Sequence, residues 1–86
     1  AEKKAYTLIG NLYMQSYEEC KKGESKVEDR LVFIAAYNQY KRAGDEAAMT
    51  KAKAQFPSIE EMFELGLSEG ESKTVGCWIN ETVIFL

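Results

Sequence analysis

The sequence predicts a mainly α-helical fold, in which about four helices form antiparallel hairpins and a β-hairpin closes the C-terminal end. Apolar residues recur at helical spacing along the first two thirds of the chain. Helix-start and helix-stop residues divide that part into segments. The last segment is instead rich in β-branched and aromatic residues. We therefore assign residues 1–66 to a helical region, and residues 67–86 to a connector and a C-terminal β-hairpin that packs on the helices.

The first helix is expected from Glu2 to Lys22. Two lysines at its end suit the negative pole of a helix dipole, and Gly23 is placed to adopt the left-handed stop conformation. Its apolar and small residues recur at spacings of three and four, which is typical of an amphipathic helix: Ala5, Leu8, Ile9, Leu12, Tyr13, Ser16, Tyr17 and Cys20.

The second helix is expected from Lys26 to Ala43. The spacing of Ser25 and Glu28 is that of a capping box, in which a hydroxyl and a carboxylate reciprocally satisfy free backbone N–H groups. Residues 31–37 are apolar almost all round, so this should be the central helix. Gly44 and Asp45 then supply a helix stop and the next N-cap, which predicts a tight reversal.

Two shorter helices should follow. The third is expected from Glu46 to Gln55 and is ended by Pro57. Ser58 and Glu61 repeat the capping-box spacing and predict a fourth helix to about Gly66 or Glu69.

The remaining segment predicts a β-hairpin. Residues 73–79 and 82–86 have the composition of strands, and Asn80 and Glu81 lie between them like a two-residue turn. We expect Trp78 to anchor this hairpin on the third and fourth helices, the alternative being exposure toward a partner.

Composition restricts the function. A chain of 86 residues with 45% hydrophobic and 29% charged residues makes one small domain. A net charge of -3 argues against nucleic-acid binding. The sequence contains no histidine, the commonest general base and metal ligand, so we expect no catalytic site, no metal site and no cofactor.

The two cysteines leave two interpretations open. Cys20 and Cys77 could form one bridge, but two cysteines are too few for a disulfide scaffold. Free, buried thiols are the expected state. Cys77 also lacks a histidine to activate it as a nucleophile.

An internal repeat relates the first two helices. A shift of 27 residues aligns Tyr6 with Phe33, and Tyr13 with Tyr40. The pattern Tyr6-x-x-Ile9-Gly10-x-x-Tyr13 resembles the first helix of a tetratricopeptide repeat, and Phe33 to Gly44-Asp45 resembles a second copy. The resemblance covers about residues 4–57. Residues 43–45, 56–61 and 76–79 also look like the C-terminal end of larger bacterial tetratricopeptide-repeat proteins. The resemblance implies that Gly10 permits close helix packing, with the aromatic residues filling the space between helices.

The resemblance also implies where a partner would bind. In this family a concave face formed by first helices binds extended peptides. The residues on the corresponding face, with Asn11 and Asn38 the best candidates, are Lys4, Asn11, Gln15, Asn38, Lys41 and Arg42.

The expected function is a non-catalytic protein-interaction scaffold or the C-terminal cap of a longer array. The alternatives are an oligomerisation domain that pairs through the C-terminal hairpin or residues 84–86, and an enzyme fragment whose site is completed by another chain.

The expected compartment is the cytoplasm, or the periplasm if a parent chain carries a signal peptide. The sequence has no run of about eighteen apolar residues, so no membrane insertion is expected. The missing initiator Met and the apolar end, residues 84–86, suggest a module cut from a longer chain.

Overall fold

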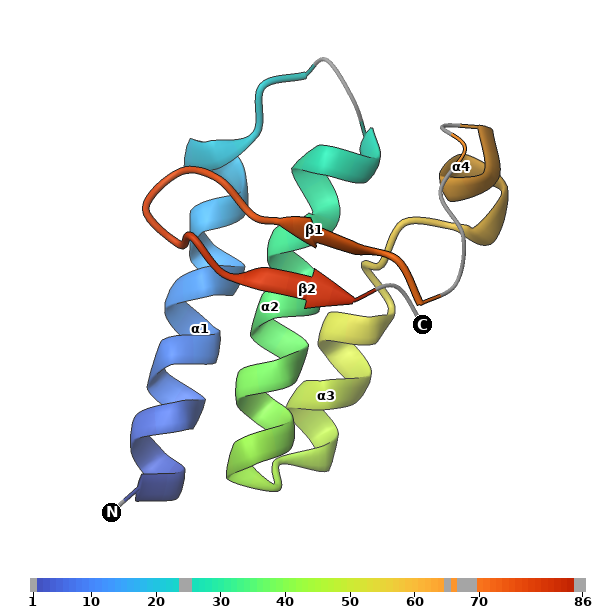
Figure 1. The fold of residues 1–86 in the computed structure, drawn as a ribbon. Helices are drawn as coiled ribbons and strands as arrows, with labels where there is room; N and C mark the ends of the chain where they lie inside the picture. The colour runs from blue at the N-terminus through green and yellow to red at the C-terminus, as the bar shows by residue number, and fades with distance from the viewer. Residues whose placement is uncertain (1, 24–25, 65, 67–69, 85–86) are drawn as a thin grey trace.

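The computed structural model describes residues 2–23, 26–64, 66 and 70–84, and it has the predicted architecture (Figure 1). The helices are α1 (Glu2–Cys20), α2 (Lys26–Ala43), α3 (Glu46–Lys53) and α4 (Ile59–Glu64). Strands β1 (Ser72–Thr74) and β2 (Thr82–Ile84) form an antiparallel hairpin. The mainly helical fold class with a C-terminal β-hairpin is therefore confirmed.

Helix α2 is the centre of the fold. It packs against α1, α3, α4 and β2, and Figure 1 shows α1 antiparallel to it and the hairpin lying across it. Every residue from Leu31 to Ala36 is buried. The apolar circumference of this segment therefore has its predicted cause, which is burial on more than one side.

The helix boundaries largely follow the local signals. Helix α2 has the predicted bounds, although Ser25 of the first capping box lies outside the described residues. Gly23 and Gly44 have φ of 76° and 72°, as their stop positions require. The second capping box forms: the Ser58 N–H donates to Glu61 Oε1, and the Glu61 N–H donates to Ser58 Oγ, both at 3.0 Å.

Three helices are shorter than expected. Helix α1 ends at Cys20, and α3 ends at Lys53 because the chain tightens into a turn at residues 54–55 before Pro57. Helix α4 ends at Glu64, before the predicted end at Gly66 or Glu69. Two predictions concern parts outside the described residues. The proposed boundary after residue 66 adjoins residues 67–69, which are not described, and the end of the second strand, residues 85–86, is not described either.

Aromatic side chains fill the space between helices, as the resemblance implied. Tyr13, Phe33 and Tyr40 are buried. The rings of Tyr17 and Phe33 lie 4.8 Å apart between centroids, and those of Tyr37 and Phe56 lie 5.4 Å apart. These separations are typical of packed aromatic pairs, so these side chains belong to the core or pack against it.

The predicted two-residue turn at Asn80 and Glu81 is wrong. The pairing of Thr74 with Thr82 leaves the seven residues 75–81 as the loop. Cys77 and Asn80 have positive φ, 62° and 47°, which no strand allows. Long-range contacts explain the difference: Val75 and Ile79 are buried in the core, and Cys77 is tied to α1.

The expectation of free, buried thiols is also wrong. Cys20 at the end of α1 and Cys77 in the loop form a disulfide, with 5.8 Å between their Cα atoms, and Cys77 is exposed. The separation lies within the range that a disulfide requires. The bridge joins positions 57 residues apart and fastens the hairpin to the helices.

Candidate functional site

A hollow on the described surface lies between α1 and α3. Its volume is about 460 Å³. Asn11 and Gln15 line it from α1, Tyr40 lines it from α2, and Ala47 and Lys51 line it from α3. We call it the α1–α3 groove. Three helices thus contribute both apolar walls and a small number of polar groups, a composition typical of binding sites.

The turn between α2 and α3 sets the position of the far wall. Gly44 takes the left-handed conformation, and the Asp45 side chain accepts a hydrogen bond of 3.1 Å from the Ala48 N–H. This cap begins α3 directly after α2 and brings Lys51 to the groove opposite α1.

Asn11 is held in place by a residue of the groove floor. The Tyr40 hydroxyl donates to Asn11 Oδ1 at 2.6 Å. Since the oxygen of the amide is directed to Tyr40, its N–H₂ group is directed away, and Asn11 itself is exposed. Burial, followed by the negative charge of Asp45, raises the pKa of Tyr40, which keeps its hydroxyl a donor.

A second hollow adjoins the first. It has a volume of about 380 Å³ and is lined by Lys4 and Leu8 of α1 and by Ala43. Both hollows share Thr7 and Asp45. Three of the six predicted contact residues, Lys4, Asn11 and Gln15, therefore lie along one continuous surface.

The other three predicted residues lie elsewhere. Asn38, Lys41 and Arg42 of α2 line neither hollow. Asn38 is half-buried, whereas Lys41 and Arg42 are exposed. The Arg42 guanidinium lies 5.8 Å from the centre of the Tyr6 ring. The 27-residue shift superimposes two helices that pack antiparallel to each other, and Asn38 does not join Asn11 in the lining of the groove.

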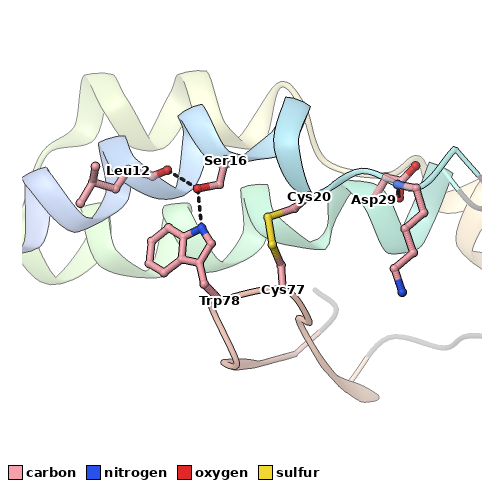
Figure 2. The surroundings of a disulfide bond; sticks show 7 residues. Leu12, Ser16, Cys20, Asp29, Cys77 and Trp78 are labelled. Atoms are coloured by element: carbon pink, nitrogen blue, oxygen red, sulfur yellow. Dashed lines mark hydrogen bonds between the residues drawn. A yellow bond between two sulfur atoms is a disulfide. The ribbon is translucent and has the colours of Figure 1, made fainter.

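Sequence reasoning missed a second cluster, at the disulfide (Figure 2). The Trp78 indole N–H donates to Ser16 Oγ at 2.9 Å, and Ser16 Oγ donates to the Leu12 carbonyl at 2.7 Å. The Trp78 ring lies 5.3 Å from the Tyr13 ring. Trp78 therefore anchors the loop on α1 and not on the third and fourth helices as expected. The even number of cysteines was the one signal of this cluster in the sequence.

A buried polar group ties the hairpin to the helices below it. Gln39 Nε2 donates to both carboxylate oxygens of Glu81, at 3.2 and 3.3 Å. Burial, together with a hydrogen bond to the Glu81 carboxylate and its negative charge, raises the pKa of Tyr13 to about 12. Both partners of Glu81 are therefore donors at neutral pH.

Comparison of the chain with protein-family models, with curated proteins and with solved structures finds no match to any of them.

Within residues 2–23, 26–64, 66 and 70–84, no three His, Cys, Asp or Glu side chains come together in a way that could hold a metal ion. None of the helices in this part of the chain is long and apolar enough to cross a membrane. What the groove offers is an oriented amide, a second amide and an ammonium group beside apolar walls.

Proposed function

We propose that this chain is a non-catalytic protein-interaction module, which binds an extended peptide segment of a partner in the α1–α3 groove. It would act as a scaffold by itself or as the C-terminal cap of a tetratricopeptide-like array. The observation that carries the proposal is the orientation of Asn11, whose N–H₂ group is free of Tyr40 and directed away from it.

The groups in the groove suit a peptide backbone. A peptide offers carbonyl acceptors and N–H donors along its length, and the side-chain amides of Asn11 and Gln15, one turn apart on α1, can satisfy both. Holding Asn11 in one orientation before binding lowers the entropy cost of association. The apolar surface of Ala47 supports contact with peptide side chains.

The compartment proposed for this function is an oxidising one. Disulfides persist in secreted and periplasmic proteins and are rare in the reducing cytosol. The Cys20–Cys77 bridge therefore favours the periplasm over the cytoplasm, which the sequence alone had favoured.

The test begins with peptide selection. A random peptide library displayed on phage is selected against the oxidised chain, and the affinity of an enriched peptide is measured by isothermal titration calorimetry. Asn11→Asp is the informative variant because it keeps an acceptor for Tyr40 and removes the two N–H donors. We expect it to weaken binding by about tenfold, the value of one or two lost hydrogen bonds.

Asn38→Asp is the matched control, since it introduces the same charge on α2, away from the groove. Its affinity should stay within about twofold of the wild type. Enriched peptides that bind Asn11→Asp as well as the wild type would count against the groove. Loss of binding in the Asn38→Asp variant alone would place the site on α2 instead.

A further inference from the structure

One face of α1 carries large apolar side chains that are more than half exposed. Leu8 and Leu12, one turn apart, are 62% and 52% exposed. Trp78, which is hydrogen-bonded to Ser16 of the same helix, is 51% exposed. Large apolar residues grouped on a surface mark sites of interaction with proteins. Tryptophan is also among the residues that contribute most to binding at such sites.

Charges of opposite sign lie at the two ends of this face. In a helix that turns by about 100° per residue, Lys4, Leu8, Leu12 and Glu19 fall within a stripe about 80° wide. Gln15 falls within the same stripe, so the stripe overlaps the edge of the α1–α3 groove. Lys4 precedes the leucines, and Glu19 follows them. Both charged side chains are exposed, and neither makes an ion pair within the part of the chain that the structure describes.

We propose that a second copy of this chain packs across this stripe, with the two α1 helices antiparallel and related by a two-fold axis. The axis passes between Asn11 and Leu12, a point equally far from Lys4 and Glu19 along the helix. Lys4 of each copy then lies beside Glu19 of the other, so that two ion pairs form. A parallel arrangement would instead place like charges together.

The same axis brings the apolar side chains together. Leu12 of one copy lies next to Leu12 of the other, and each Leu8 falls at the level of Gln15 in the opposite copy. That level is one residue from Ser16, where the Trp78 indole is held. Each Trp78 therefore covers a Leu8 of the other copy, and the pair removes four leucines and two tryptophans from water.

This order of charges is the reason to identify the occupant as a second copy. A two-fold interface must be complementary to itself, and a helix with a cation at one end of an apolar stripe and an anion at the other meets that condition when it is turned end to end. The area is small, so the association should be weak, in the micromolar to millimolar range.

Sedimentation equilibrium of the oxidised chain at low ionic strength tests the proposal, because screening is then weakest. We expect a concentration-dependent dimer. Leu12→Ser should abolish the dimer. The variant should remain folded because Leu12 is half-exposed, and circular dichroism checks this. Lys4→Glu or Glu19→Lys alone should weaken the dimer about tenfold, since each change makes two facing pairs repulsive.

Two further samples distinguish pairing from a general effect of charge. The double variant Lys4→Glu, Glu19→Lys should dimerise within about threefold of the wild type. An equimolar mixture of the two single variants should form a heterodimer that is stronger than either homodimer, because both of its facing pairs are complementary. Lys53→Glu, an equal change of charge on α3, is the control and should have no effect.

Three results would overturn the proposal. The first is a monomer at all concentrations, in which case the stripe binds a different partner or none. The second is a dimer that Ile84→Ser abolishes and Leu12→Ser leaves intact, since Ile84 is an exposed apolar residue of strand β2, away from α1. The third is a double variant that dimerises as weakly as the two single variants.

Discussion

The ring of Tyr40 lies directly on the backbone of Gly10. A Cβ atom at position 10 would be 2.6 Å from Tyr40 Cε1, a separation that van der Waals contact does not allow. The ring cannot easily move away, because it is buried and its hydroxyl is hydrogen-bonded to Asn11. The close approach of α1 and α2 therefore depends on glycine at this position.

Gly10→Ala should destabilise the protein. Alanine favours a helix by about 1 kcal/mol relative to glycine, but overpacking against a fixed ring costs about 2 to 3 kcal/mol. We expect a net loss of about 1 to 2 kcal/mol in the free energy of unfolding, measured with chemical denaturant. In a Tyr40→Leu background the same change should cost less, since the ring is gone.

Gly76→Ala is the control for this prediction. Position 76 has open space around it and an ordinary φ, so the change should stay within about 0.5 kcal/mol of the wild type. An equal loss at both positions would show that the contact with Tyr40 is not the cause.

Removing the disulfide should lower stability more than any single contact. The bridge closes a loop between residues 57 apart, and the loss of loop entropy in the unfolded chain corresponds to about 4 kcal/mol. The double variant Cys20→Ser, Cys77→Ser and the reduced wild type should unfold at similarly low denaturant concentrations. Reductant should have no effect on the double variant. Two free thiols in the unreduced, unfolded wild type would disprove the bridge.

The helices could be predicted from the sequence because their signals are local. Gly44 stops α2 and Asp45 caps α3 within two adjacent residues, and Ser58 reaches Glu61 three residues on. Each signal acts through its own backbone and needs no other part of the fold.

The hairpin loop could not be predicted in this way, because distant residues determine its shape. Trp78 bonds to Ser16, which is 62 residues away, and Glu81 bonds to Gln39, which is 42 residues away. The strand-like composition of residues 75–79 therefore led to the wrong prediction of a two-residue turn at residues 80–81. The groove was only partly predictable for a related reason: a repeat in sequence relates Asn11 to Asn38, but only Asn11 lines the groove, to which α2 contributes Tyr40 instead.

Alkaline pH should destabilise the protein through Tyr13. Its pKa is raised from 10.0 to about 12, first by burial and then by the hydrogen bond and charge of Glu81. Between these two values the unfolded chain loses the Tyr13 proton and the folded chain keeps it, so unfolding becomes more favourable as the pH rises. The contribution of Tyr13 is complete below pH 10 and is lost by about pH 12.

Glu81→Gln separates the causes of this shift. The variant removes the carboxylate charge and leaves the burial, so the pKa of Tyr13 should fall part of the way toward 10.0. Absorbance of the tyrosinate form, followed in folded and unfolded protein, measures it, and Glu60→Gln on α4 is the control. A pKa that does not respond to Glu81→Gln would contradict the assigned contact.

The link between α1 and the loop should be measurable through Trp78, the one tryptophan of the sequence. Ser16 is buried and accepts the indole N–H at 2.9 Å, so Ser16→Ala should cost about 1 kcal/mol and leave that N–H to water. Tryptophan emission should then shift to longer wavelength. In a Trp78→Phe background, which keeps an aromatic ring beside Tyr13 and lacks the donor, Ser16→Ala should cost less by the value of this one bond. Ser16 also donates to the Leu12 carbonyl, so the loss of stability that persists in the Trp78→Phe background measures this second bond. Strictly additive losses of stability would show that the indole and Ser16 do not interact in solution.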